Sequence, residues 1–333
     1  MRTNALADTA PAPAPWQSRS EQHVRILQQL KRYARQTDAT ILLEGESGTG
    51  KSYLARQIHA HSPRAGRPYH EVLLSALDDN LSGSDLFGHV AGAFTDAKHH
   101  RPGAFVSANG GTLFLDEIGK ASPAVQRKLL HVVEDGTLLQ YGTDRTMRVD
   151  VRVVAATNVP LEQLVQDGRF LPDLAPRFGL FRVRLVPLRE RPEDIPALAI
   201  SIVERRAPRC GFRLVPEIDR DLMTALRRAE WPLNVRQLDA SLHRILVDAE
   251  GASVLRLEHC LDDLAYLRSI GRRPKDVTPA HAQTAAGRRQ SRAQTAQQLG
   301  ISPATLYRRL AAAREDSRTI ETEPREQAAD RSQ

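Results

Sequence analysis

The sequence contains Gly45-Glu46-Ser47-Gly48-Thr49-Gly50-Lys51-Ser52, which matches the phosphate-loop pattern G-x-x-x-x-G-K-[ST] at every fixed position. An apolar, β-prone run at 39–43 enters this stretch, and 52–59 has helical spacing after it. The glycines let backbone N–H groups turn toward an anion, and the N-terminus of the following helix adds its positive dipole end. The stretch therefore predicts an ATP site in which Lys51 reaches the β and γ phosphates and Ser52 supplies a hydroxyl to Mg²⁺.

Two acids follow a second apolar run. Residues 112–115 are apolar and β-prone, and they end in Asp116 and Glu117. At the end of a buried strand, Asp116 can hold Mg²⁺ and Glu117 can polarise the water that attacks the γ-phosphate. Such a run alone is more often a strand entering a turn. After a phosphate loop it predicts a catalytic site.

The β-type runs alternate with helical stretches over residues 21–186, beginning with an amphipathic helix at about 21–35 and including another at 122–134. This alternation predicts an α/β subdomain with a doubly wound parallel sheet and its ligand at the carboxyl ends of the strands. The expected strands lie near 39–43, 68–74, 112–116 and 149–156. The last of them ends in Thr157-Asn158, which places Asn158 beside the γ-phosphate.

After residue 186 helical patterns replace the strands. They cover about 194–207, 217–229, 234–249 and 257–268. We expect a smaller all-α subdomain over residues 187–270, followed by a linker rich in proline, glycine and charge at 271–285.

Composition narrows the class of protein. Of 333 residues 41% are hydrophobic, which is typical of a soluble globular chain. The sequence lacks both an apolar run near the ~18 residues of a membrane helix and the layout of a signal peptide, so we expect a cytoplasmic protein. Residues 1–20, with alternating proline and alanine, and residues 316–333 are expected to be disordered. No sensory domain fits ahead of residue 20, so control is expected to come from expression level or from a separate protein.

The net charge of +7 is concentrated near the end of the chain. Between Arg272 and Arg314 nine Lys/Arg residues stand against one acid, Asp276. Within this block, residues 286–315 read as helix, glycine-containing turn and second helix, the layout of a DNA-binding helix-turn-helix. A helical hairpin without a DNA role is the alternative. The residues expected on the DNA-facing side are Ser302, Ala304, Thr305, Arg308 and Arg309.

Five ordered motifs together identify a family. Besides the phosphate loop they are Asp85-Leu86-Phe87-Gly88-His89 with Gly92-Ala93-Phe94-Thr95-Asp96-Ala97 after it, Gly111-Thr112-Leu113-Phe114-Leu115-Asp116-Glu117-Ile118, Pro187-Leu188-Arg189-Glu190-Arg191, and Trp231-Pro232-Leu233-Asn234-Val235-Arg236-Gln237-Leu238. The chain resembles the bacterial enhancer-binding activators of sigma-54 RNA polymerase from about residue 20 to 315. These activators combine an AAA+ ATPase, which has a helical lid, with a Fis-type helix-turn-helix.

The resemblance implies a function and a set of roles. It implies a ring, usually a hexamer, that binds enhancer-like DNA and remodels the closed sigma-54 promoter complex as ATP is hydrolysed. The ring could contain one kind of subunit or include a related activator. Phe94 and Thr95 would contact the polymerase, Arg236 of the lid (residues 187–270) would sense the phosphates, and Arg177 would reach a neighbour's γ-phosphate. An arginine of that kind contributes a factor of roughly 10³–10⁵ to phosphoryl transfer.

Four positions depart from the family pattern. Asp96 replaces a glycine at the loop tip, and Leu233 replaces a glycine of the lid. Leu73 stands where an asparagine usually couples the catalytic glutamate to the loop. Leu171 stands where one of two interface arginines is usual, and Arg169 could replace it only through a shift in register. The residues that bind the nucleotide are thus intact, whereas residues that would link ATP hydrolysis to the loop tip, the lid and the neighbouring subunit are altered.

The activator is the leading interpretation, and these departures keep one alternative function open beside it. The chain could be a degenerate AAA+ regulator or co-activator that binds DNA and ATP, hydrolyses ATP weakly, and needs a partner subunit or acts without sigma-54.

Overall fold

The computed structural model describes residues 17–35, 39–76, 82–93, 97 and 99–260 of the 333-residue chain. All of them belong to one unit, Met1–Gly271, and the second unit, Arg272–Gln333, lies outside them. The predicted polymerase-contacting tip, with Phe94, Thr95 and Asp96, also lies outside the described residues. So do most of the predicted leader, the linker, the helix-turn-helix with its five DNA-facing residues, and the tail.

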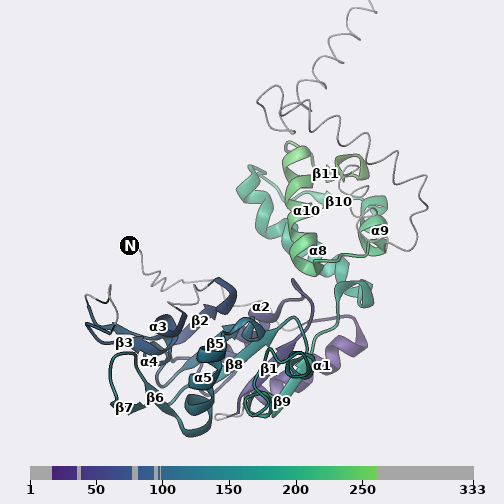
Figure 1. The fold of residues 1–333 in the computed structure, drawn as a ribbon. Helices are drawn as coiled ribbons and strands as arrows, with labels where there is room; N and C mark the ends of the chain where they lie inside the picture. The colour runs from purple at the N-terminus through teal and green to yellow at the C-terminus, as the bar shows by residue number, and fades with distance from the viewer. Residues whose placement is uncertain (1–16, 36–38, 77–81, 94–96, 98, 261–333) are drawn as a thin grey trace, which may run out of the picture. The chain divides into compact units, whose positions relative to one another are not determined.

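A five-stranded parallel sheet forms the centre of the α/β subdomain (Figure 1). Its strand order, β2-β5-β8-β1-β9, places strands that are distant in sequence side by side. The predicted doubly wound parallel sheet is confirmed. The strands are β1 Ile41–Glu44, β2 Tyr69–Leu73, β5 Thr112–Asp116, β8 Arg152–Thr157 and β9 Phe181–Arg184.

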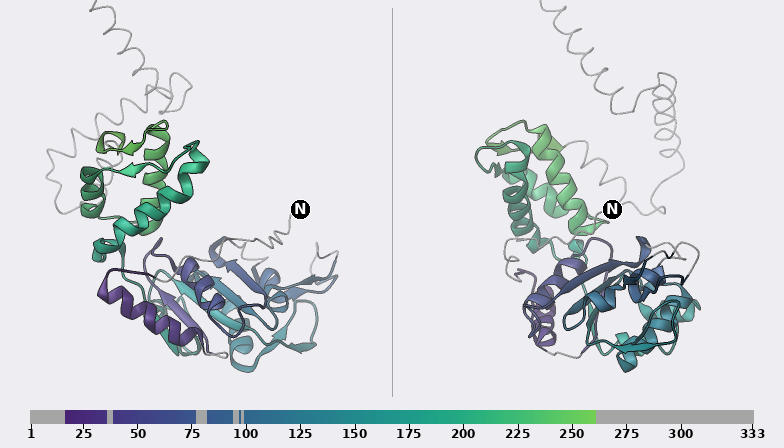
Figure 2. Two further views of the ribbon diagram at one scale, coloured as in Figure 1. Left: turned by 180° about the vertical axis from the view of Figure 1, so that it is seen from behind. Right: turned by 90° about the vertical axis from the view of Figure 1, so that its left-hand side faces the viewer.

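Helices cover both faces of this sheet (Figure 2). Alternate strand residues divide between two buried clusters, as the two-residue period of a strand requires: Ile41 and Leu43 belong to one cluster and Leu42 to the other. Helices α1 Glu21–Ala34 and α2 Lys51–Ala60 pack on the first face. The second face is covered by α3 Ser82–Phe87, α4 Ala104–Ser107, α5 Pro123–Asp135, α6 Leu161–Gln166 and α7 Ala175–Phe178.

The strand expected at 149–156 begins later than predicted. The N–H of Val149 donates to the carbonyl of Gly136 and the carbonyl of Asp150 accepts from Gly110, so these residues bond outside the ladder and β8 starts at Arg152. At that point the buried Arg152 guanidinium donates to the carbonyls of Tyr33 and Ala34. It thereby satisfies carbonyls at the C-terminal end of α1.

Strand β9 and two short antiparallel pairs are not among the predicted elements. Strand β9 is an edge strand with only Val183 fully buried, so it lacks the long apolar run that marked the inner strands. The two pairs join strands of two or three residues, too short to leave a periodic signal. They are β3 Gly88–His89 with β4 Arg101–Pro102, and β6 Thr137–Leu139 with β7 Thr146–Arg148.

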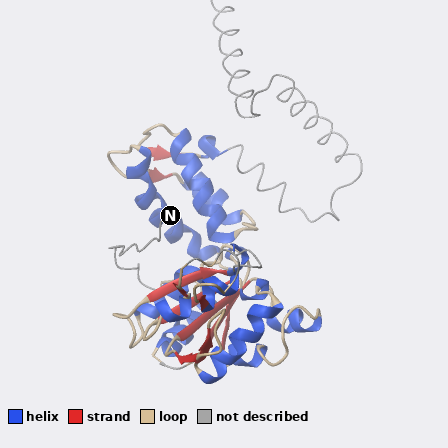
Figure 3. Cartoon of the chain, turned by 60° about the vertical axis from the view of Figure 1, so that its left-hand side comes forward, coloured by secondary structure: helices blue, strands red, loops and turns tan. Residues whose placement is uncertain are grey.

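The lid has its own apolar core, built on Trp231, which is fully buried. Its helices are α8 Ile195–Arg206, α9 Arg220–Arg228 and α10 Asn234–Asp248. The expectation that strands cease after residue 186 is wrong, because β10 Glu217–Ile218 pairs in parallel with β11 Val254–Leu255 (Figure 3). This pairing delays the start of α9, which Asp219 caps by accepting from the Asp221 N–H at 3.0 Å.

Short 3₁₀ turns connect the elements. The last of them occupies the start of the helix predicted at 257–268, and the remainder of that helix lies outside the described residues. Among the described residues, no helix combines the length and the apolar character needed to cross a bilayer. The turns are η1 Leu74–Ala76, η2 Ile118–Lys120, η3 Leu188–Glu190, η4 Pro192–Asp194, η5 Ala207–Cys210 and η6 Leu257–Cys260.

Candidate nucleotide-binding site

The phosphate loop connects the carboxyl end of β1 to the first residue of α2. Gly48 and Gly50 have φ angles of 77° and 103°, in the left-handed region that glycine enters without strain. At the entrance to the loop the Gly45 N–H donates to the carbonyl of Thr157, at the end of the neighbouring strand β8. These conformations and the helix N-terminus give this segment the geometry of an anion-binding loop.

Lys51 is held over this loop. Its Nζ donates to the carbonyls of Gly45 at 2.7 Å and Glu46 at 3.0 Å, and the residue is only 8% exposed. Burial lowers the pKa of Lys51, while the nearby carboxylates of Asp116 and Glu117 raise it. The structure therefore brings the lysine of the loop and the two acids of β5 into one electrostatic site.

Ser52 and Asp116 lie in contact, as a shared metal site requires. The Ser52 hydroxyl donates to Oδ2 of Asp116 at 3.2 Å, across 64 residues of sequence. A hydroxyl and a carboxylate are both oxygen ligands of the kind that Mg²⁺ binds, with phosphates and waters completing its octahedral shell. These two residues therefore fit a Mg²⁺ ion that accompanies a nucleotide.

Glu117 has an unusual backbone. Its φ of 57° is in the left-handed region, which a non-glycine residue rarely adopts, and its N–H donates to Oδ1 of Asp116 at 3.0 Å. Such conformations cost about 1–3 kcal/mol and are frequent at active sites. This conformation ends β5 at Asp116 and leads directly into the 3₁₀ turn η2.

Lid residues lie against the loop from the other side. The Arg236 guanidinium donates to the Ser47 hydroxyl at 2.9 Å, and its charge contributes to the lowered pKa of Lys51. The Glu46 carboxylate accepts from both terminal nitrogens of Arg189, at 2.7 and 2.6 Å, and these bonds lower the pKa of Glu46. Arg236 is a predicted site residue, whereas no pattern in the sequence marks the bond from Arg189 to Glu46, although Arg189 lies in the motif at 187–191.

Leu73 lies next to the acids, where an asparagine is usual. In the β2–β5 ladder it is paired in register with Asp116, and its side chain is 43% exposed. Asn158 follows the end of β8 and is also exposed. Both positions therefore open onto the carboxyl edge of the sheet, and Leu73 offers no hydrogen-bonding group there.

Arg177 and Leu171 occupy the two positions that the family resemblance places at the interface between subunits, and their surroundings differ. Arg177 of α7 forms an ion pair with Glu134 of α5, and its side chain is half-exposed. The side chain of Leu171 is half-buried and packs against the core of the α/β subdomain, whereas Arg169 is exposed. Leu171 therefore has a packing role in this chain.

Leu233 is compatible with its position despite the glycine expected there. Its φ is −107°, which any residue adopts, and its side chain is half-exposed. The left-handed residues of this turn are instead Trp231 and Asn234, with φ angles of 47° and 53°.

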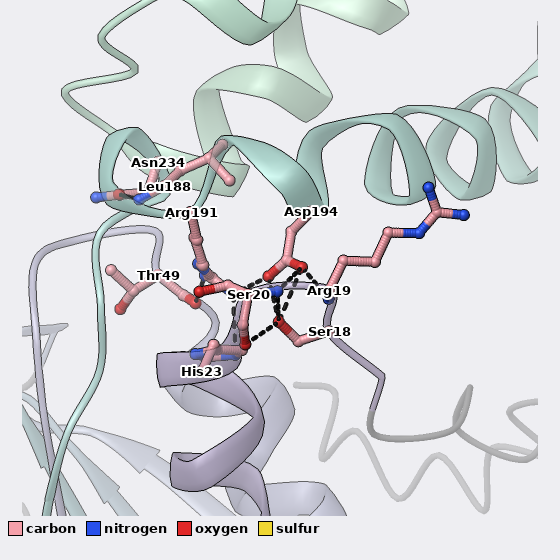
Figure 4. Close-up of polar contacts among 9 residues, drawn as sticks. All are labelled: Ser18, Arg19, Ser20, His23, Thr49, Leu188, Arg191, Asp194 and Asn234. Carbon is pink, nitrogen blue, oxygen red and sulfur yellow. Dashed lines mark hydrogen bonds and ion pairs between the residues drawn. The ribbon is translucent and has the colours of Figure 1, made fainter.

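A buried polar network lies where the N-terminal segment meets the lid (Figure 4). Asp194 accepts from the Ser18 hydroxyl at 2.8 and 2.7 Å and from the Arg19 N–H at 2.6 Å. Arg191 donates to Nε2 of His23 at 2.9 Å and forms an ion pair with Asp194 at 3.6 Å. Ser18 and Arg19, which the sequence analysis includes in the leader 1–20, are among the described residues and bond to Asp194.

This network predicts a pH dependence of stability. Burial, reinforced by the charge of Arg191, lowers the pKa of His23 from 6.5 to about 4, although Asp194 opposes the shift. The unfolded chain therefore takes up a proton that the folded chain does not, and stability falls as the pH drops from about 6.5 toward 4. Between pH 7 and pH 5 the loss from His23 should be about 2 kcal/mol.

Urea unfolding at pH 7, 6 and 5 measures this effect. His23→Gln should lose less stability over that range than the unmodified chain, whereas His243→Gln, at an exposed histidine of α10, should behave like the unmodified chain. Equal losses for His23→Gln and the unmodified chain would show that His23 does not carry the effect.

Three features together define an AAA+ P-loop protein. They are a phosphate loop between a parallel strand and a helix, two acids at the end of β5, which lies two places from β1 in the sheet, and a helical lid. The chain belongs to the sigma-54 interaction domain family. The family described as "Sigma-54 interaction domain" matches residues 17–184, and "AAA+ ATPase lid domain" matches residues 189–275.

Similar proteins include two regulators and one solved structure. The Nif-specific regulatory protein of Azorhizobium caulinodans is 43% identical over 249 residues, which are 73% of this chain and 40% of that protein. The DNA-binding transcriptional regulator NtrC of Escherichia coli K12 is 45% identical over 234 residues, 69% of this chain and 48% of that one. The chain thus spans less than half the length of these relatives. The structure of NtrX from Brucella abortus in complex with ATP has a TM-score of 0.69 and 26% identity, covering 89% of this chain and 68% of that chain.

Proposed function

We propose that this chain is an ATP-dependent transcription activator that acts on sigma-54 RNA polymerase in the cytoplasm and uses ATP hydrolysis to promote opening of the promoter. The observation that carries the proposal is the contact between Ser52 and Asp116 beside a complete phosphate loop, in a chain of the sigma-54 interaction domain family. Family membership supports the polymerase as target, and this contact supports the nucleotide chemistry.

The proposed roles follow from where the side chains lie. Lys51 and Arg236 bring positive charge to the phosphates, and Ser52 with Asp116 would hold Mg²⁺, which would neutralise charge on the transferred phosphoryl group. Glu117 would accept a proton from the attacking water, and Asn158, exposed at the end of β8, would help to position that water. The whole loop, Gly45 to Ser52, would bind the nucleotide.

The proposed assembly is a ring, with six subunits as the expected number. The half-exposed side chain of Arg177, on α7, supports a role for Arg177 in the site of a neighbouring subunit, because a second chain could reach it there. A ring of identical subunits and a mixed ring with a related activator both provide such a neighbour.

The remaining partners are assigned to segments outside the described residues. We propose that Phe94 and Thr95 contact sigma-54. We also propose that residues 286–315 bind double-stranded DNA at an upstream site, through Ser302, Ala304, Thr305, Arg308 and Arg309. The basic charge of 272–314 and the predicted helix-turn-helix support the second assignment.

In a second candidate function the chain binds nucleotide and DNA but hydrolyses ATP only weakly. Leu73, in register with Asp116, supplies no polar group where the acids would need one to respond to the nucleotide. A regulator or co-activator with weak ATPase activity, dependent on a partner subunit or independent of sigma-54, would have this feature.

An ATPase assay of the purified chain, with and without a sigma-54 promoter complex, separates the two functions. The activator is expected to hydrolyse ATP alone at roughly 1 s⁻¹ or faster, as working enzymes do, and to respond to the promoter complex. Slow turnover that is unchanged by the promoter complex would favour the second function.

Substitution of Leu73 tests the physical basis of that alternative. Leu73→Asn restores an amide beside the acids, so the isolated chain should hydrolyse ATP at least about tenfold faster if the missing group limits turnover. Leu73→Ala is the matched control, because it removes the leucine without adding a hydrogen bond. If neither variant differs from the unmodified chain, Leu73 does not limit the reaction.

A further inference from the structure

A phosphate loop binds its anion through backbone N–H groups that point inward, so its carbonyls point outward. Buried carbonyls without partners are costly, and a flexible loop can rotate its peptide planes to find other partners. Whatever holds the carbonyls outward therefore also holds the N–H groups in place for the phosphates.

In this chain the lid supplies those partners for three successive carbonyls. Asn234 donates from Nδ2 to the carbonyl of Ser47 at 2.9 Å, the Val235 N–H donates to Gly48 at 3.0 Å, and Arg191 donates to Thr49 at 3.1 Å. The carbonyls of Gly45 and Glu46 are bonded within the loop segment itself, by Lys51. Among these five loop carbonyls, those held by the lid are thus the ones of residues 47–49; at Glu46 the lid bonds the side-chain carboxylate instead, through Arg189 and Asn234.

Close packing reinforces these bonds. A Cβ atom built on Gly48 would lie 2.1 Å from the carbonyl oxygen of Leu233 and 3.0 Å from Cβ of Arg236. The lid backbone therefore lies directly against the loop, and only a glycine at position 48 allows this approach.

The two lid side chains are themselves fixed. Asn234 is fully buried, and its Oδ1 accepts from the Leu188 N–H at 2.7 Å. Arg191 is 4% exposed and is held by His23 and Asp194 (Figure 4). Because their other contacts restrain both side chains, the positions of the loop carbonyls depend on where the lid lies.

We propose that Asn234 and Arg191 are positioning residues for nucleotide binding: by holding the carbonyls of Ser47 and Thr49, the lid pre-organises the phosphate-binding N–H groups of the loop. This inference rests on the proposed nucleotide site and goes beyond it. Any movement of the lid would change the affinity of the loop for phosphates, even without a contact between the lid and the ligand.

The test uses Asn234→Gly and Arg191→Met in the full chain. Glycine tolerates the φ of 53° at position 234 but removes the donor, and methionine fills space at 191 without donating. Asp239→Asn is the matched control. Asp239 lies on α10, the helix that begins at Asn234, and its substitution weakens ion pairs with Arg205 and Arg206 of α8 rather than a bond to the loop. Affinities for MgATP and for inorganic tripolyphosphate are measured by calorimetry, well below each variant's melting temperature.

Each of the two variants is expected to lose about tenfold in affinity, the magnitude of one hydrogen bond, by the same factor for both ligands. The control should stay within about twofold of the unmodified chain even if it melts earlier. The inference is overturned if folded Arg191→Met and Asn234→Gly bind both ligands as tightly as the unmodified chain, or if they lose affinity for MgATP alone. If one of these two variants does not fold, the affinities of the other variant decide whether the inference holds. A failure of the unmodified chain to bind MgATP would instead contradict the proposed function.

Discussion

Lys51→Ala should lose on the order of 100-fold in affinity for MgATP, because an ammonium that would bond the phosphates carries more energy than a neutral donor. Lys51 is almost fully buried at the loop, so water cannot easily replace it. Lys31→Ala, which removes an exposed lysine from α1, is the matched control and should bind normally. Titration with labelled ATP measures both, and undiminished binding by Lys51→Ala would show that the site is wrongly assigned.

Glu117→Gln should separate binding from turnover. The amide cannot accept a proton from the attacking water, so the rate should fall by roughly 10²–10⁴ while MgATP still binds. Asp116→Asn should in addition weaken the dependence on Mg²⁺, since Asp116 and Ser52 form the proposed metal site. A Glu117→Gln variant that hydrolyses ATP at the normal rate would remove Glu117 from the mechanism.

Truncation at Lys275 should abolish sequence-specific DNA binding and leave ATP binding intact. The described core belongs to the unit Met1–Gly271, which has its own apolar clusters, whereas the predicted helix-turn-helix lies beyond it. The probe is a duplex selected from a random pool by the full chain. An undiminished footprint by the truncated chain would contradict the assignment of residues 286–315.

Single substitutions in the full chain refine this prediction. If Arg308 or Arg309 bonds a guanine edge, its alanine variant should lose about 1–3 kcal/mol and relax specificity at one position. If it contacts a phosphate, affinity should fall evenly across sequences and the salt dependence should become shallower.

The sequence predicted the parts of the site that are continuous in the chain. The loop 45–52 with its flanking strand and helix, and the acids at the end of β5, are local patterns that tertiary structure did not alter. Because parallel strands place their carboxyl ends at one edge, the contact between Ser52 and Asp116 followed from the predicted sheet.

Contacts between residues that are distant in the sequence could not be predicted from local patterns. Arg191 and Asn234 carry no sign of their bonds to the loop, since these depend on how the lid packs. Burial of His23 has the same origin, because Arg191 and the N-terminal segment enclose it only in the folded chain. The family pattern predicts a departure at Leu233, where a glycine is usual, but the left-handed residues of this turn are Trp231 and Asn234.

Formation of open promoter complexes by sigma-54 RNA polymerase tests the central proposal most directly. Full-length protein, polymerase and a promoter with the selected upstream site are incubated with ATP or with a non-hydrolysable analogue, and melted promoter DNA is detected by permanganate reactivity. The proposed function predicts melting that requires hydrolysable ATP and is lost with Glu117→Gln. Promoter melting that is equally efficient with the analogue, or none with ATP under conditions where the chain binds both ATP and DNA, would contradict it.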